Sequence, residues 1–177
     1  MVIYCTPHSG RNGSGAVYAL LEHAYRTEFG GKHPEIMKTS HGKPYFAGSP
    51  DVHFSLSHAR THVLCAVSDS PVGCDIESPR SISQNALRFF SSPEELALFE
   101  PLDLWVLKES YVKLFGQTIA SIRNLRFTRQ GDGSPVLLSD QENRPLVFSR
   151  LYRIGDCSAA VCSLVALPPP PDSIVLI

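Results

Sequence analysis

The 177-residue sequence has no long hydrophobic run and no excess of charge of either sign. No apolar stretch approaches the roughly 18 residues that a membrane-spanning helix needs. The start, MVIYCTPHSG, lacks the basic and apolar segments of a signal peptide. With 16 basic and 17 acidic residues, the net charge of −1 argues against bulk electrostatic binding to nucleic acid or an anionic membrane. We therefore expect neither a nucleic-acid partner nor a membrane partner.

Paired cysteine motifs are also missing. The five cysteines are odd in number, and none of them belongs to a C-x-x-C pair. Most of them lie in apolar, strand-like runs, where a cysteine acts as a small hydrophobic residue. This usage excludes a disulfide framework and a zinc knuckle, and it favours a reduced protein of the cytoplasm.

The sequence does contain enough apolar residues, 43%, for one domain or for two small halves on a shared core. Apolar residues at helical spacing predict one helix that ends at Gly30 and another from about Asp103 to Gly116. Ser92 and Glu95 have the spacing of a capping box, so a helix is expected to begin there. Most of the remaining segments are short, strand-like and bounded by turn residues.

The order of these elements suggests an internal duplication. A strand, a helix and further strands are followed by a second strand, helices and strands, with a join near Ser70 and Pro71. We therefore expect an N-terminal half, a C-terminal half and a tail, over residues 1–70, 71–167 and 168–177. The prolines of the tail predict an edge strand or a loose end there.

The stretch GCDIE contains two carboxylates that a strand would place on one face. Side chains alternate along a strand, so Asp75 and Glu77 point the same way. Two such carboxylates repel each other unless a cation or basic groups lie between them. Hard oxygen ligands at this spacing suit Mg²⁺ together with substrate phosphates. A solvated strand end is the simpler interpretation of this motif taken alone.

The stretch WVLKESYVKL places Lys108, Glu109 and Lys113 one turn apart on a helix, beside Trp105, the single tryptophan. An apolar stripe on the opposite side predicts that these four residues share another face. A surface salt bridge between Glu109 and Lys113 would explain part of the pattern. One glutamate does not need two lysines and an indole, so a site for phosphate and metal remains the alternative.

Three further segments carry groups that suit phosphate. Ser57 and His58 in FSLSHA offer a hydroxyl and an imidazole. No G-x-S-x-G motif surrounds Ser57, which argues against a Ser/His hydrolase. HGKP is a turn that contains Lys43, and SGRNGSG leads into a helix where backbone N–H groups and Arg11 would meet an anion. This segment lacks the P-loop pattern.

Taken in order, these motifs resemble the 4′-phosphopantetheinyl transferases of the two-half, surfactin-synthetase-activating type. That family has a G-K-P turn, an F-[NS]-x-S-H strand, a G-x-D-x-E strand and a W-x-x-K-E-[AS]-x-x-K helix. The matching segments here are residues 42–44, 54–58, 73–77 and 105–113. The resemblance runs from about Arg11 to Gly116 and continues weakly through the C-terminal strands.

The resemblance implies an α+β fold of two similar halves related by a pseudo-two-fold, with coenzyme A in the cleft between them. It implies an enzyme that transfers the phosphopantetheine arm of coenzyme A to a serine of an apo acyl, peptidyl or aryl carrier protein and releases adenosine 3′,5′-bisphosphate. Because both halves lie in one chain, it also implies a monomer.

The resemblance further implies roles for single residues. Asp75, Glu77 and Glu109 would hold Mg²⁺, with Mn²⁺ as the alternative metal, against the pyrophosphate. Glu109, directly or through a water molecule, would be the general base for the carrier serine. Lys113 and Lys108 would stabilise the phosphoryl oxygens and the leaving group. The residues expected to bind coenzyme A are Arg11, Lys38, Gly42, Lys43, Ser57, His58 and Lys113.

Two functions of other classes stay open. One is a non-catalytic module that binds coenzyme A or a nucleotide. The three carboxylates and Lys113 argue against it, because a pure binder needs no base. The other is a Mg²⁺-dependent phosphohydrolase that uses water as the nucleophile. Consumption of coenzyme A only in the presence of an apo carrier would separate these functions from the transferase.

Overall fold

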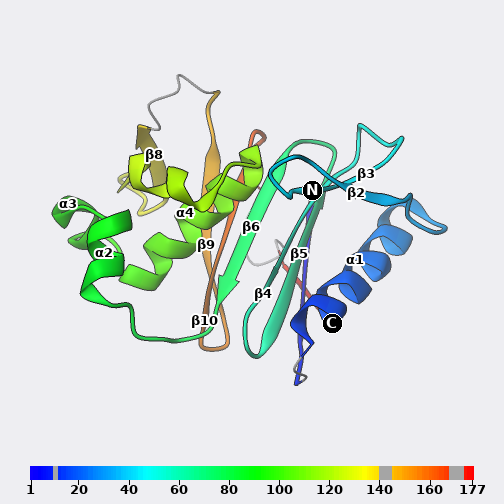
Figure 1. Ribbon diagram of the computed structural model, residues 1–177, viewed down its shortest axis with the longest axis horizontal. Helices are drawn as coiled ribbons and strands as arrows, with labels where there is room; N and C mark the ends of the chain where they lie inside the picture. Colours follow the sequence, from blue (N-terminus) through cyan, green and yellow to red (C-terminus); the bar gives the residue numbers. More distant parts are fainter. Residues whose placement is uncertain (10–11, 140–144, 168–173) are drawn as a thin grey trace.

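Two α+β units follow each other along the chain (Figure 1). The computed structural model describes residues 1–9, 12–139, 145–167 and 174–177. The first unit consists of β1 (Val2–Pro7), α1 (Gly13–Phe29), β2 (Ile36–Lys38), β3 (Pro44–Phe46), β4 (His53–His58) and β5 (His62–Ser68). The second consists of β6 (Val72–Glu77), α2 (Gln84–Phe90), α3 (Pro93–Leu96), α4 (Pro101–Phe115), the 3-10 helix η1 (Ile119–Asn124), β7 (Arg126–Arg129), β8 (Pro135–Ser139), β9 (Phe148–Ile154) and β10 (Cys157–Ser163).

The main sheets of the two units have the same topology. The strand order β1-β5-β4 in the first unit corresponds to β6-β10-β9 in the second, and all these pairs are antiparallel. Each unit also has a separate hairpin, β2-β3 or β7-β8. The short strand β11 (Val175–Leu176) pairs in parallel with the free edge of β1. The expected α+β class with two similar halves is therefore confirmed.

Each sheet has one long helix on it, and the two sheets share a core. Helix α1 packs on the first sheet and α4 on the second (Figure 1). A third apolar cluster joins residues of both units, among them Ile3, Leu64, Val72, Ile76 and Val161. All five cysteines are buried and unpaired. No helix in the described part of the chain is long and apolar enough to cross a membrane.

The neighbouring strands β4 and β6 are joined by serine side chains. The Ser55 hydroxyl accepts a hydrogen bond from the backbone N–H of Cys74 at 2.9 Å, and the Ser57 hydroxyl accepts one from Ile76 at 3.3 Å. These contacts satisfy backbone donors at the edge of β6 that no strand in the described part of the chain pairs with. The alternating serines of FSLS thus connect the two units.

Gly73 allows α4 to pack directly on β6. A Cβ atom at this position would lie 2.0 Å from the carbonyl oxygen of Ser110 and 2.4 Å from the backbone nitrogen of Leu114. Both contacts are with backbone atoms, so only glycine fits without moving the helix. This close packing sets the position of the α4 side chains relative to β6.

Local sequence signals predicted most helix ends correctly. Ser92 and Glu95 form the expected capping box at the start of α3, and α4 ends at Gly116 in the left-handed conformation, with φ of 62°. Helix α4 begins at Pro101, slightly before the expected Asp103. The short helices α2 and η1 were not predicted, because they are too short for apolar periodicity to show.

Candidate functional site

Asp75, Lys113 and Ser57 meet where the two units touch. Asp75 comes from β6, Lys113 from the last turn of α4 and Ser57 from β4. Lys113 Nζ lies 2.7 Å from Asp75 Oδ1, and the Ser57 hydroxyl donates to the same oxygen at 2.7 Å. Lys113 Nζ also donates to Ser57 Oγ at 3.1 Å. The three side chains form a triangle of charge-assisted hydrogen bonds.

The second carboxylate oxygen of Asp75 has no comparable contact. Asp75 is only 5% exposed, and its Oδ2 has no hydrogen-bond partner among the described residues. Leaving a buried acceptor without a partner costs roughly 1–3 kcal/mol, and more for a charged group. An atom of this kind is a natural point of contact for a water molecule or a ligand that brings a proton donor or a positive charge.

Glu109 lines the same groove, one helical turn before Lys113. The groove is lined by Leu56, Ser57, His58, Asp75, Ile76, Glu77, Glu109 and Lys113. Burial raises the pKa of Glu109 to about 7; the negative charges of Asp75 and Glu77 add to this effect, while Lys113 opposes it. A carboxyl group with a pKa near neutrality is suited to take up a proton during a reaction at that pH.

Glu77 is paired with an arginine from the loop that follows β6. Arg80 Nε lies 3.3 Å from Glu77 Oε2, and Arg80 Nη2 lies 3.3 Å from Glu77 Oε1. The guanidinium also lies over the ring of Trp105, at 5.4 Å from its centroid. The Arg80 and Glu77 side chains are 44% and 28% exposed, so this pair is weak and easily opened.

The groove fits a divalent cation in its charge and in its donor atoms. Asp75, Glu77 and Glu109 all face it, the buried Asp75 Oδ2 lacks a partner among the described residues, and burial together with the neighbouring carboxylates raises the pKa of Glu109. Hard carboxylate oxygens of this kind are the ligands that Mg²⁺ prefers. Within the described ranges, however, no three histidine, cysteine or acidic side chains are already clustered closely enough to hold a metal. The donors are present without a preformed cage.

His58 lies at the end of β4, against the first turn of α1. A Cβ atom at Gly13 would lie 2.8 Å from His58 Nδ1, so a larger residue there would push the imidazole ring out of its present position. Backbone N–H groups and the dipole at the start of a long helix attract anions. His58 is exposed there and faces the groove as well. Arg11, which was expected to bind an anion at this point, lies outside the described residues.

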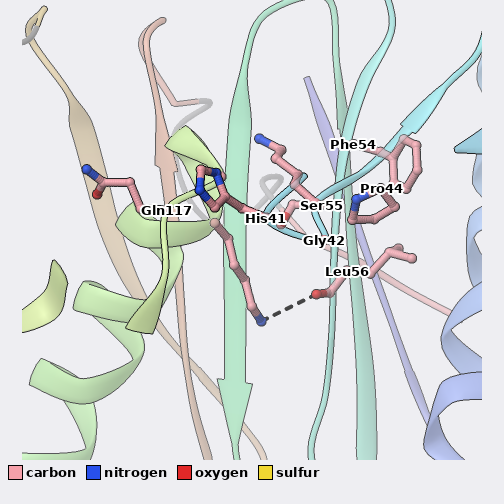
Figure 2. A pocket seen from close by; sticks show the side chains of 10 residues that line it. His41, Gly42, Pro44, Phe54, Ser55, Leu56 and Gln117 are labelled. Carbon is pink, nitrogen blue, oxygen red and sulfur yellow. Dashed lines mark hydrogen bonds between the residues drawn. The ribbon is translucent and has the colours of Figure 1, made fainter. Parts of the chain in front are cut away.

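A second pocket adjoins the groove and is lined by the HGKP loop, β4 and the end of α4 (Figure 2). Its labelled side chains include His41, Phe54 and Gln117. Lys113 lines this pocket as well as the groove, and its Nζ lies 3.4 Å from the Leu56 carbonyl oxygen, where the dashed line in Figure 2 ends. Lys113 therefore lies at the border between the two cavities.

The two lysines expected to bind coenzyme A from the first unit differ in their surroundings. Lys43 Nζ donates to the backbone carbonyls of Leu114 at 2.7 Å and Val72 at 3.3 Å, which ties the HGKP loop to the second unit. Burial lowers the pKa of Lys43 to about 8. Lys38 is exposed on β2. Gly42 adopts a φ of 85°, the left-handed conformation that the turn before Lys43 requires.

Lys108 is not part of the groove, and the prediction that it acts on phosphate is wrong. Its side chain is 0% exposed, and its ammonium donates to the carbonyls of Phe90 at 2.5 Å and Leu125 at 2.8 Å and lies 2.8 Å from Glu95 Oε1. All three ammonium protons thus have protein acceptors. The predicted polar face of α4 is split, because the end of α2, α3 and η1 cover the side that carries Lys108.

Three residues that support the site or the helix behind it were not identified from the sequence. Ser55 joins β4 to β6, Arg80 pairs with Glu77, and Glu95 neutralises Lys108. The alternation of serines in FSLS was a usable signal for Ser55, since Ser57 had already been selected. Arg80 and Glu95 carried no such signal, because charged residues at these spacings are common on any surface.

Residues 71–162, more than half of the chain, match the family described as the 4′-phosphopantetheinyl transferase superfamily. The chain belongs to this superfamily. The matched region includes Asp75, Glu77, Glu109 and Lys113, and therefore most of the groove that the second unit supplies.

Bacterial 4′-phosphopantetheinyl transferases are similar over a longer part of the chain. The Sfp protein of Bacillus subtilis (strain 168) is 30% identical over 148 residues, which are 77% of this chain and 65% of that protein. A transferase of Bacillus pumilus is 33% identical over 133 residues, which are 69% of this chain and 57% of that protein. This chain therefore spans less than two thirds of the length of these relatives.

Solved structures of holo-acyl-carrier-protein synthases are more distant. The enzyme of Helicobacter pylori, described in complex with coenzyme A, has a TM-score of 0.45 and 17% identity, and covers 51% of this chain and 96% of its own. The enzyme of Plasmodium yoelii has a TM-score of 0.43 and 17% identity, and covers 52% of this chain and 91% of its own.

Proposed function

We propose that the chain transfers the phosphopantetheine arm of coenzyme A to a serine of an apo acyl, peptidyl or aryl carrier protein. The observation that carries this proposal is the meeting of Asp75, Glu77, Glu109 and Lys113 in one groove between the units, in a chain of this superfamily. Three carboxylates and a lysine in one groove are suited to a reaction at a pyrophosphate, which requires both positive charge and a base.

The reaction needs a base for the carrier serine. The serine oxygen forms a bond to the phosphorus that carries the pantetheine arm, and the bond from that phosphorus to the oxygen of adenosine 3′,5′-bisphosphate breaks. The electron pair of the broken bond stays on the leaving phosphate, and the serine proton goes to the base. Glu109 is our candidate, directly or through a water molecule, since it faces the groove one helical turn before Lys113 and burial raises its pKa to about 7 in the metal-free protein.

The reaction also needs positive charge at the phosphates. Lys113, at the border of the groove and the second pocket, would supply it to the phosphoryl oxygens. Asp75, Glu77 and Glu109 would hold Mg²⁺, or Mn²⁺ in its place, which neutralises charge on the pyrophosphate. Ser57 would orient Lys113 and Asp75 through the hydrogen bonds that join it to both.

The nucleotide end of coenzyme A is assigned to the first unit. His58 and the start of α1 would bind a phosphate, and the loop with Gly42 and Lys43 would line the adjacent pocket. Arg11 and Lys38 are also assigned to coenzyme A, and only the resemblance to the family supports them. Residues 1–70 would thus form the nucleotide side and residues 71–167 the metal side of a cytoplasmic monomer.

The test is incubation with coenzyme A, Mg²⁺ and a panel of apo carriers, followed by mass spectrometry of each carrier. We expect one carrier to gain the mass of one phosphopantetheine, and chelation of the metal with EDTA to stop the reaction. Asp75→Asn should abolish transfer, while Asp51→Asn, at an exposed position outside the groove, should not. Consumption of coenzyme A without a carrier would indicate a phosphohydrolase, and binding without consumption a non-catalytic module.

His58 provides a test of the nucleotide end. His58→Ala should weaken the use of coenzyme A more than that of 3′-dephospho-coenzyme A, because the second substrate lacks the phosphate that the imidazole would contact. The measurement is kcat/KM for both substrates in both proteins. Equal losses with the two substrates would contradict a contact between His58 and the 3′-phosphate.

A further inference from the structure

Both acidic side chains of β6 are already paired with a basic side chain of the protein. Lys113 Nζ lies 2.7 Å from Asp75 Oδ1, and Arg80 lies 3.3 Å from Glu77. These are the same carboxylates that face the groove proposed for the metal. In this state of the molecule the protein's own cations therefore neutralise the carboxylates that a divalent ion would bind.

Lys113 is held less tightly than a fully buried lysine. Its side chain is 31% exposed, and besides Asp75 it has two weaker acceptors, Ser57 Oγ at 3.1 Å and the Leu56 carbonyl at 3.4 Å. It also lines both adjoining cavities. A flexible four-carbon chain at such a border lets the ammonium move by a few ångströms without disturbing the core.

Lys113 and a divalent ion would compete for the charge of Asp75 even on different oxygens, since Lys113 contacts Oδ1 and Oδ2 has no partner among the described residues. The side chain is buried, and a buried carboxylate without a counter-charge is strongly unfavourable. A divalent ion on Asp75 would lie within a few ångströms of the Lys113 ammonium, and like charges at that distance repel strongly in a partly buried site. Arrival of a divalent ion at Oδ2 would therefore favour movement of the ammonium away from Oδ1.

We infer that Lys113 is the resident counter-ion of Asp75 and that the pyrophosphate of coenzyme A draws it away, which frees Asp75 for the divalent cation. The inference rests on the metal site of the proposed function and adds the order of events there. Metal and coenzyme A then bind cooperatively, since each favours the arrangement that the other needs. By linkage the effect is reciprocal.

The test is a titration with Mn²⁺, followed by the electron paramagnetic resonance signal of the free ion, with and without coenzyme A and with no carrier present. Lys113→Met should bind Mn²⁺ alone about tenfold more tightly than the wild type, a typical size for coupling between two sites. The gain in Mn²⁺ affinity caused by coenzyme A should be smaller in the variant by the same factor. Direct contacts between phosphate and metal are common to both proteins, so this difference isolates the exchange.

Lys32→Met is the matched control, since it removes the same charge from an exposed position outside the groove. It should titrate like the wild type. If Lys113→Met does not fold, Lys113→Gln keeps a hydrogen-bond donor for Asp75 without the charge and gives the same comparison. The exchange would be overturned if the folded variant bound Mn²⁺ no more tightly than the wild type. Carrier modification is measured separately, so a failure of transfer alone would refute the proposed function and leave the exchange standing.

Discussion

Lys108 and Lys113 lie five residues apart on α4, and both pair with a carboxylate, yet their surroundings have little in common. The Lys108 ammonium is fully enclosed and held by Glu95 and two backbone carbonyls. Lys113 is partly exposed at the boundary between the units and shares Asp75 with Ser57. An ion pair with every donor satisfied stabilises one arrangement, whereas one at a groove can exchange partners.

The difference arises from what covers each side of the helix. The side of α4 that carries Lys108 packs against α3, η1 and the end of α2. Glu95 belongs to the capping box of α3 and also accepts the backbone N–H of Phe127 at 3.0 Å, so one carboxylate joins three elements. The end of α4 that carries Lys113 faces β4 and β6 instead, where the two units leave a groove.

Lys108→Met should give the largest effect on stability. It leaves Glu95 buried without its counter-charge, and breaking a buried pair in this way costs about 3–5 kcal/mol. Urea unfolding measures the loss. The kcat of the protein that remains folded should stay close to that of the wild type. A kcat loss as large as that of Lys113→Ala, in protein shown to be folded, would remove the distinction between the two lysines.

Lys113→Ala should instead act on the rate. Removal of a preorganised group that meets transition-state charge lowers kcat about a hundredfold or more. Lys113→Arg should recover little, because a planar guanidinium does not replace a compact ammonium in a tight site. The assay is carrier modification with Mg²⁺ at saturating coenzyme A. Normal kcat in Lys113→Ala would make this lysine only a salt-bridge residue.

Glu109→Gln should change how stability depends on pH. The folded-state pKa of about 7 lies above the ordinary value of 4.5, so between these values the native state holds a proton that the unfolded state has lost. Stability of the wild type should therefore fall as pH rises through this window, and this contribution should stay constant above it. In metal-free buffer the Tm of Glu109→Gln should exceed that of the wild type increasingly from pH 4.5 to 7.

The control for this pH effect is Glu22→Gln, at an exposed position on α1. Its Tm difference from the wild type should show no comparable growth between pH 4.5 and 7. A constant difference for Glu109→Gln across the same range would contradict a carboxyl group that titrates near neutrality.

Arg80→Met should give the smallest effect. Its pair with Glu77 is exposed on both sides, and exposed pairs contribute below about 1 kcal/mol. Urea unfolding should show a loss within that range, well below the loss for Lys108→Met. A loss of several kcal/mol would mean that the contact with Trp105, and not the ion pair, organises the loop after β6.

Local patterns were enough to predict part of the site. The alternation in GCDIE predicted that Asp75 and Glu77 share a face, and both line the groove. The capping box at Ser92 was also correct. The prediction for Lys108 was wrong because helical periodicity separates polar from apolar residues but cannot show which polar residues other elements will cover.

The sequence by itself determined the order of the elements, the capping box at Ser92, the glycine end of α4 and the presence of three carboxylates and a lysine in motifs of one family. These features depend on residues that are near neighbours in the chain, or on the identity of single residues. Only the tertiary structure decided which charges meet. Asp75 and Lys113 are 38 residues apart, and Lys108 and Glu95 are 13 apart. The packing of α4 against β6 on one side, and against α3 and η1 on the other, sets the partner of each buried charge. The reason is that a desolvated charge is tolerated only where the packing supplies a counter-charge.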